Sequence, residues 1–377
     1  MQRKSVTKRN GPSRSRPSRS RPSIEVCPDC EGVSRRTFLQ RASGLLAAGV
    51  AGSALPLAGL APRAAFGGEE KPAAPKKPAE TVVKLLYESL TPEQKKIMHF
   101  PFDHELRRKI SNNWDVVPKE VGAIGKLYTP DQKDLMRQIF RGVTSEEGYD
   151  RFQKQMKDDD GGFENYTCAI FGEPGSGKFE WLMTGRHLTI RADGESVENT
   201  AFGGPIFYGH AVQFNEQPDH PGNVWWHQAR MANEIFQSLD GKQKEKALLQ
   251  MDPPDEDKTV VLKGPNGEIP GLAVKDMSKD HAALLEKTLK NMLSMYRESD
   301  VEEALTCIKE NGGLDSLHLS FYKEGDLGSD GIWDRWRVEG PALVWYFRGS
   351  PHVHAWVNIA HKAEGSLPGI TSKKARV

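Results

Sequence analysis

The chain has 377 residues, of which 37% are hydrophobic and 27% are charged, as in an ordinary globular protein. Its net charge of +1 hides an uneven distribution. Residues 1–67 hold 12 Lys and Arg against 3 Asp and Glu, which leaves 40 against 48 for residues 68–377. An acidic body excludes a general nucleic-acid binder, whose affinity depends on neutralising phosphates with Lys and Arg.

A pair of arginines near the N-terminus indicates export. Arg35 and Arg36 lie in Ser-Arg-Arg-Thr-Phe-Leu-Gln, and the weakly apolar residues 42–61 follow. The segment resembles a twin-arginine (Tat) signal, with Gln40 in place of the usual Lys. A membrane-spanning helix is the alternative, but Pro56 and several glycines within the run disfavour a stable span.

The signal predicts how the N-terminal region is used. We expect residues 1–67 to be a Tat signal with a long, basic, disordered leader, which the Tat translocase recognises. The mature protein is then periplasmic or extracellular, or membrane-anchored if the signal stays uncleaved. Because Tat substrates fold before export, often around a cofactor, the signal also favours a bound cofactor.

The rest of the chain predicts a single α+β domain with a largely antiparallel sheet packed with helices. Residues 68–80 are a Pro-rich linker, 81–362 the domain and 363–377 a flexible tail. Capping patterns predict helix starts near residues 91, 130, 240 and 278, and apolar spacing adds helices over 226–238 and 300–310. Alternating or β-branched runs predict strands over 165–172, 178–193, 196–209, 316–324, 334–347 and 352–359.

A glycine-rich stretch imitates a nucleotide-binding loop. Gly172 to Lys178 fits the G-x-x-x-x-G-K pattern of a P-loop, which requires Ser or Thr next and then a helix. Here Phe179 follows, and the residues after it alternate as a strand. We therefore predict a hairpin turn over Glu173 to Lys178 and no ATP.

Two cysteines, Cys168 and Cys307, follow the signal. Export to an oxidising compartment permits a disulfide between them. Two buried free thiols are the favoured interpretation, because a chain of this length needs no covalent staple.

Short stretches through the mature chain resemble the DUF3500 family of uncharacterised bacterial proteins. In order they are LTPEQKK, FPFDHELR with the following NW, IFGEPG, WLMTGRHLTI, FGGPIFYG, ANEIFQSL, VEGPALVWYF and HVHAW. Their shared order over residues 81–362 carries the resemblance. Because the family has no known activity, the resemblance implies no particular chemistry.

The chain also departs from the family pattern. Relatives often have two adjacent histidines after the glycine, whereas here Arg186 precedes His187. They often carry acidic residues in the strand after Gly340-Pro341, where this chain has Trp-Tyr-Phe-Arg at 345–348. A site that uses those acids or that histidine would be altered or lost.

The pair His352 and His354 is the leading candidate for chemistry. On a strand, residues i and i+2 point to the same face with Cα atoms about 7 Å apart, so both imidazoles can bind one metal ion. His187 is the predicted third ligand, since it lies on a predicted strand near a glycine. Three histidines with an open position suit catalytic Zn, Cu or Fe. Solvated or carbonyl-bonded imidazoles are the alternative.

A pocket wall is predicted around a loop rich in Gly, Pro, Asn and Trp. Its members are Trp181, Arg186, Trp225 and Trp226, with His227 as a reserve ligand or base. The alternative is that the tryptophans cover the core.

Two functions follow from these features. The first is an exported, histidine-ligated metal-binding hydrolase or oxidoreductase that acts on a small molecule. The second is a non-catalytic periplasmic or surface protein that binds a small molecule or a partner. Whether the chain is an enzyme stays open at this point.

Overall fold

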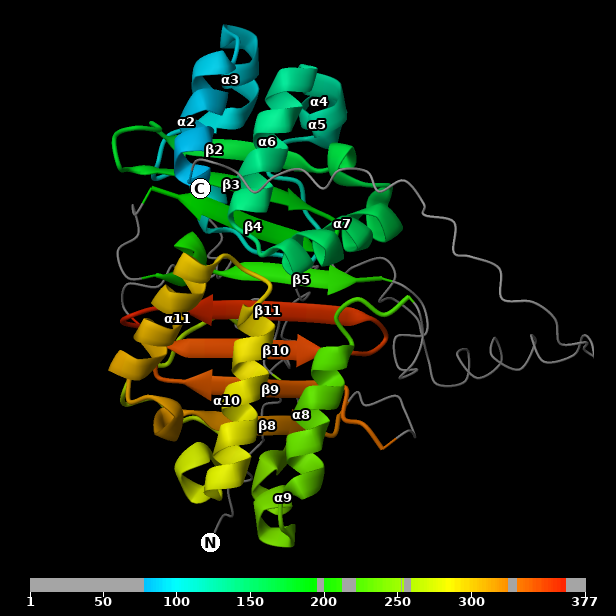
Figure 1. Cartoon of the computed structure of the whole chain (residues 1–377), viewed down its shortest axis with the longest axis vertical. Helices are drawn as coiled ribbons and strands as arrows, with labels where there is room; N and C mark the ends of the chain where they lie inside the picture. The colour runs from blue at the N-terminus through cyan, green and yellow to red at the C-terminus, as the bar shows by residue number, and fades with distance from the viewer. Residues whose placement is uncertain are drawn as a thin grey trace, which may run out of the picture. The chain divides into compact units, whose positions relative to one another are not determined.

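A computed structural model describes residues 78–194, 200–211, 222–251, 253, 259–324 and 331–363. The predicted signal lies outside these residues, as does almost all of the predicted tail. Within them, helices cover one face of an 11-stranded mixed sheet (Figure 1). The prediction of an α+β fold with a largely antiparallel sheet is confirmed.

The strands follow a simple spatial order, β1-β2-β3-β4-β5-β11-β10-β9-β8-β6, with β7 pairing to β8 off this path. Only the short β1–β2 and β6–β8 pairs are parallel among the described strands. The strands are β1 (His99–Phe100), β2 (Thr167–Gly172), β3 (Phe179–Gly185), β4 (Leu188–Asp193), β5 (Ile206–His210), β6 (Leu248–Leu249), β7 (Leu272–Ala273), β8 (His318–Tyr322), β9 (Arg335–Gly340), β10 (Leu343–Arg348) and β11 (Val353–Ile359).

The helices pack on the same side of the sheet in two groups, which Figure 1 shows in front of the two halves of the sheet. They are α2 (Ala79–Ser89), α3 (Pro92–Met98), α4 (Lys119–Gly122), α5 (Ile124–Leu127), α6 (Pro130–Gly142), α7 (Glu146–Asp160), α8 (His227–Ser238), α9 (Gly241–Ala247), α10 (Lys279–Leu293) and α11 (Glu298–Glu310). None of the described helices combines the length and apolar character needed to span a membrane.

The predicted helix starts are confirmed by their caps. Thr91, Thr129 and Asp240 each form a capping box with the glutamine three residues later. The Ser278 side chain accepts a hydrogen bond from the backbone N–H of His281 at the start of α10. These caps satisfy amide groups that have no partner inside the helix, so four residues suffice to place each start.

Two of the predicted strands were too long. The stretch 178–193 divides into β3 and β4 at Arg186 and His187, and 334–347 divides into β9 and β10 at Pro341 and Ala342. Both turns have only two residues, so the apolar pattern runs on across them. In 196–209, the described part holds a short 3₁₀ turn and β5.

The hairpin predicted in place of a P-loop is confirmed. Gly172 at the end of β2 pairs with Phe179 at the start of β3, and the two strands are antiparallel. No helix follows Lys178, so the stretch lacks the strand-to-helix geometry that cradles phosphates.

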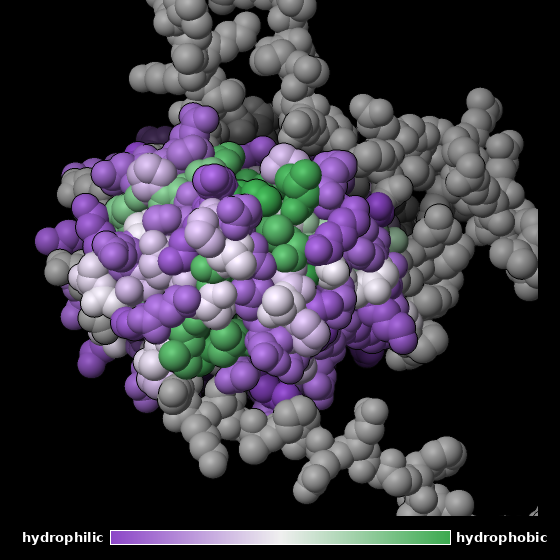
Figure 2. All heavy atoms as spheres, turned by 90° about the horizontal axis from the view of Figure 1, so that it is seen from above, coloured by the Kyte–Doolittle hydropathy of each residue, from purple (hydrophilic) through white to green (hydrophobic). Residues whose placement is uncertain are grey.

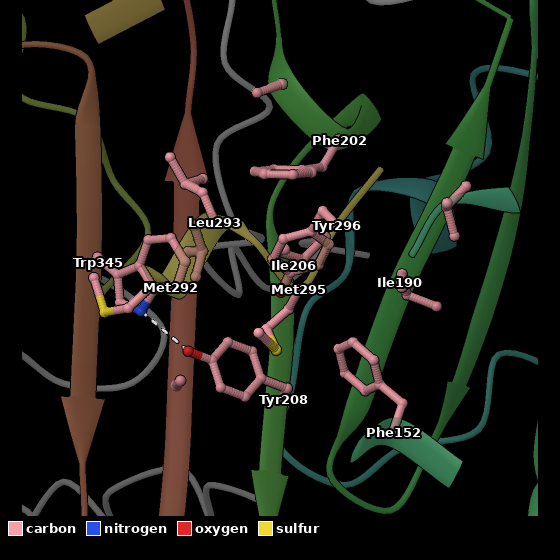
Figure 3. Packing of buried hydrophobic residues seen from close by; sticks show 14 of the residues in the cluster. Phe152, Ile190, Phe202, Ile206, Tyr208, Met292, Leu293, Met295, Tyr296 and Trp345 are labelled. Atoms are coloured by element: carbon pink, nitrogen blue, oxygen red, sulfur yellow. Dashed lines mark hydrogen bonds between the residues drawn. The ribbon is translucent and has the colours of Figure 1, made fainter. Parts of the chain in front are cut away.

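The main hydrophobic core lies between the helices and the sheet. Figure 3 shows part of it, where aromatic rings from β5, β10 and α7 meet Met and Tyr side chains of the segment after α10. The Trp345 indole N–H donates to the Tyr208 hydroxyl over 3.2 Å, which satisfies a polar group inside this apolar cluster.

The opposite face of the sheet has two smaller clusters, covered by irregular segments. Trp114 and Val116 pack on β2 and β3, whereas Val260 and Leu262 pack near β5, β10 and β11. Figure 2 views the end of the molecule where α3 and α4 lie and shows a mainly hydrophilic surface with small apolar patches. The histidines predicted as metal ligands lie on this face opposite the helices. His187 contacts Phe207 and His354 contacts Trp356, both members of the second of these clusters.

Candidate metal centre

The structure brings together the three histidines His187, His352 and His354, which lie up to 167 positions apart in the sequence. Each offers one ring nitrogen, and the three nitrogens lie within 4.8 Å of one another. The ring centroids are 4.6–4.9 Å apart, and all three side chains are buried. Donor nitrogens of a tetrahedral site with bonds of roughly 2.0–2.1 Å lie about 3.3 Å apart, so a small contraction would complete a three-histidine site.

The first of these histidines, His187, is held by a turn that requires unusual backbone geometry. It is the second residue of the two-residue β3–β4 turn and has φ 57°, a left-handed conformation that is uncommon for residues other than glycine. Its N–H donates to the Asn112 carbonyl over 3.0 Å, and its carbonyl accepts from Gly209 N–H over 3.1 Å and from Gln155 Nε2 over 2.7 Å. Strained residues of this kind gather at functional sites, because the surrounding structure must hold them.

A carboxylate fixes the orientation of the His187 ring. Asp159, in the last turn of α7, lies 2.9 Å from His187 Nδ1 through Oδ2, and both side chains are buried. The other oxygen of Asp159 accepts the backbone N–H of Ala211 over 2.8 Å. With Nδ1 donating to Asp159, Nε2 of His187 is the ring nitrogen left to bind a metal ion. This carboxylate–histidine arrangement is the usual support of a metal ligand.

A hydrogen-bonded chain links the other two histidines. Arg348 Nη2 lies 2.6 Å from Nδ1 of His354, and Nε2 of His354 lies 2.9 Å from Nε2 of His352. Because a guanidinium only donates, the bond to Nδ1 places the His354 proton on Nε2, which then donates to His352. A metal ion at Nε2 of His354 would require that proton to leave and Arg348 to release Nδ1.

A glycine leaves the space that the rings fill. A Cβ atom at Gly209 would lie 2.4 Å from the Val353 carbonyl oxygen and 3.3 Å from both His187 Cβ and His354 Cδ2. The contact with backbone cannot be relieved by a side-chain rotation. Gly209 of β5 therefore permits the close approach of the β3–β4 turn and β11.

The supporting acids were missed in the sequence. Asp158, Asp159 and Asp160 form the last turn of α7. Asp158 pairs with His210 Nε2 over 3.0 Å, while burial lowers the pKa of that imidazole. Three carboxylates at the negative end of a helix dipole are locally unfavourable. Three acids at this end of a helix are therefore a sign, readable in the sequence, that these side chains have partners elsewhere in the fold.

The predicted pocket residues lie in different surroundings. Trp181, Trp225 and Trp226 belong to the main core on the helix side of the sheet. Trp225 still contributes to the site indirectly, because its indole N–H donates to Gln155 Oε1 over 2.8 Å and Gln155 holds the His187 carbonyl. Arg186 precedes His187 in the turn, and its carbonyl accepts from a buried tyrosine hydroxyl over 2.7 Å.

The reserve base and the two thiols are also placed by the structure. His227 begins α8, and burial lowers the pKa of its imidazole to about 4. Cys168 and Cys307 are buried and not joined in a disulfide, and burial raises the pKa of each thiol to about 12. Thiols that stay protonated at neutral pH are poor nucleophiles.

A cavity of about 840 Å³ lies away from the histidines. It is bounded by the end of β4 and the start of α11, and its charged lining residues include Arg191, Asp193, Arg297 and Asp300. Arg297 is itself paired with Asp300 over 2.6 Å. The cavity is polar and its charges are at least partly compensated, so its size alone does not mark it as the reactive site.

Comparisons with known proteins identify a family but no activity. The family model described as "Protein of unknown function (DUF3500)" matches residues 73–361. No curated protein and no solved structure matches the chain.

Proposed function

The chain belongs to the DUF3500 family, and from this premise we propose that it is an exported protein that binds one transition-metal ion, Zn, Cu or Fe, through His187, His352 and His354. We further propose that the ion serves hydrolytic or redox chemistry on a small molecule. Export rests on the Arg35-Arg36 motif, with the Tat translocase as the transport partner and a periplasmic or extracellular destination.

One observation carries the metal proposal: three buried imidazole nitrogens lie within 4.8 Å of one another. The support around His187 points the same way, because Asp159 engages Nδ1 and leaves Nε2 of that ring to bind an ion.

Three protein ligands leave a coordination position for water or a substrate. A bound ion there would supply Lewis acidity or lower the pKa of a bound water, as in hydrolytic metal sites. The chain's own contributions are to exclude water around the buried rings and to fix the His187 tautomer through Asp159. Arg348, at hydrogen-bond distance from His354, places a positive charge beside the ligands.

A second candidate function is small-molecule binding without catalysis. The cavity of about 840 Å³ between β4 and α11 favours it, because a polar cavity of this size can hold a small polar ligand. In that case the histidines would be a hydrogen-bonded structural cluster, and ligand binding would not depend on metal.

Elemental analysis tests the proposal. The exported protein, purified without a His tag, is compared with His187→Ala and His352→Ala and with the control His281→Ala at the start of α10. We expect about one metal ion per chain in the native protein and the control, and loss in both site variants that retain native circular dichroism. A native protein that takes up no Zn, Cu or Fe would reject the metal site. A ligand-dependent rise in melting temperature without metal would then favour the second function.

A further inference from the structure

A row of basic side chains continues the histidine site across the sheet. Four residues on neighbouring strands lie opposite one another in this row. Arg335 of β9 pairs with Arg348 of β10, and Arg348 pairs with His354 of β11. His354 in turn pairs with Gly209 of β5. Directly opposed residues of antiparallel strands project to the same face. The two arginines therefore lie beside the histidines, on the face opposite the helices.

The outer arginine of the row lacks a counter-charge within the described part of the chain. Arg335 is half-buried, and its Nε is buried without a hydrogen-bond partner. Arg337, two residues on, differs in having a counter-charge, because a Glu339 oxygen lies 3.0 Å from its Nε and its Nη2 donates to Glu339 over 3.2 Å. Arg337 therefore has an acidic partner on this face, whereas the Nε–H of Arg335 has no hydrogen-bond acceptor among the described residues.

Two opposed arginines in one row are unfavourable unless something negative lies between or beside them. A divalent ion at the histidines would increase the positive charge further. The +2 of the ion would add to the +1 of each arginine, and the −1 of Asp159 offsets only part of that charge. An anion would remove this excess.

We propose that the site takes a small oxyanion, a carboxylate or a phosphate, held by Arg348 and Arg335 beside the metal position. This inference rests on the proposed metal site and names the substrate class for it. The guanidinium fork matches the paired oxygens of both groups, and it binds them by charge-assisted hydrogen bonds. Metal binding at His354 Nε2 would free Arg348 from Nδ1, so the ion and the anion would bind cooperatively.

The test is calorimetric titration of the full-length, zinc-loaded protein with inorganic phosphate and with acetate. The informative variant is Arg335→Gln, because Arg348 on β10 separates Arg335 from His354 on β11 and the loss of Arg335 should leave the zinc content unchanged. Lys287→Gln, on an exposed position of α10 across the sheet, removes the same charge as a control. Arg335→Lys keeps the charge without the fork and replaces Arg335→Gln if that variant does not fold.

We expect at least one of the two anions to bind with one-to-one stoichiometry, and its affinity to fall by about tenfold or more in Arg335→Gln while zinc stays at one per chain. The anion affinity of Arg335→Lys should lie between those of the wild type and Arg335→Gln. The anion affinity of Lys287→Gln should match that of the wild type. The inference is overturned if zinc-loaded protein binds neither anion, or if Arg335→Gln binds as tightly as wild type. A wild-type chain that takes up no zinc would instead reject the proposed function, and this inference with it.

Discussion

The support of His187 gives the sharpest test of how the site is built. Asp159 accepts two hydrogen bonds, from His187 Nδ1 over 2.9 Å and from the Ala211 N–H over 2.8 Å. Asp159→Asn keeps the shape of the side chain but supplies only one carbonyl oxygen. One of the two N–H groups must then face the amide NH₂; the His187 side chain is buried and Ala211 is half-buried.

The size of the effect follows from these contacts. Loss of a carboxylate that orients a metal-bound histidine typically costs 10- to 100-fold in metal affinity, which is about 1.4–2.7 kcal/mol. The metal-free protein should also lose about 1–3 kcal/mol of unfolding free energy, because a buried donor is left unpaired. Asp159→Asn is therefore expected to lower both the metal affinity and the unfolding free energy of the metal-free protein.

The assay is zinc affinity at pH 7 by competition with a chromophoric chelator, beside urea unfolding of the metal-free protein. Asp158→Asn is the matched control, since it removes the neighbouring carboxylate of the same helix turn. Asp158 pairs with His210 and Lys154 and is 27% exposed, whereas Asp159 is 1% exposed. We expect the control to keep zinc affinity within about twofold, because its histidine is not among the three proposed ligands.

The role of Asp159 in orienting His187 would be refuted if Asp159→Asn bound zinc as tightly as wild type. It would be refuted equally if both Asn variants lost affinity to the same extent. The second result would show that general damage to the end of α7, rather than ring orientation, controls the metal.

Three further changes test the surroundings. Gly209→Ala should lower the unfolding free energy by about 1–3 kcal/mol in urea, because its Cβ would lie 2.4 Å from a carbonyl oxygen; an unchanged midpoint would show that β5 and β11 can separate. Glu180→Gln should cost about 3–5 kcal/mol, since it leaves two buried arginines, Arg107 and Arg191, without their shared carboxylate; a loss below 1 kcal/mol would contradict this. The lowered pKa of His227, about 4, means that the unfolded chain binds the proton more tightly, so stability should fall as pH drops from about 6.5 to about 4. His227→Gln should flatten that decline in unfolding experiments, and an unaltered slope would exclude His227 as a cause.

The elements that sequence could predict are those with local causes. The helices at Thr91, Thr129, Asp240 and Ser278 begin with a cap whose partner is three residues away, so the signal is complete within one turn. The two-residue turn at Arg186 and His187 gave no break in the apolar pattern, and its strands were predicted as one. A tight turn needs suitable backbone angles, not polar residues, so composition alone does not reveal it.

The site was predictable only in part. Two histidines two residues apart are a local pattern, and the structure places His352 and His354 side by side. The role of Asp159 depends on where the end of α7 meets the β3–β4 turn, a contact that arises from the sheet order. The row from Arg335 to His354 likewise exists only because β9, β10 and β11 are neighbours in the register observed.

One ion held by the three imidazoles is the feature on which the proposed function depends. The direct measurement is anomalous diffraction from crystals of the metal-loaded protein, collected on both sides of the absorption edge of the ion found by elemental analysis. We predict one strong peak within about 2.0–2.2 Å of Nε2 of His187, His352 and His354, with Arg348 turned away from His354. Metal-loaded crystals with no peak there, in which the Arg348–His354–His352 hydrogen bonds persist, would contradict the account.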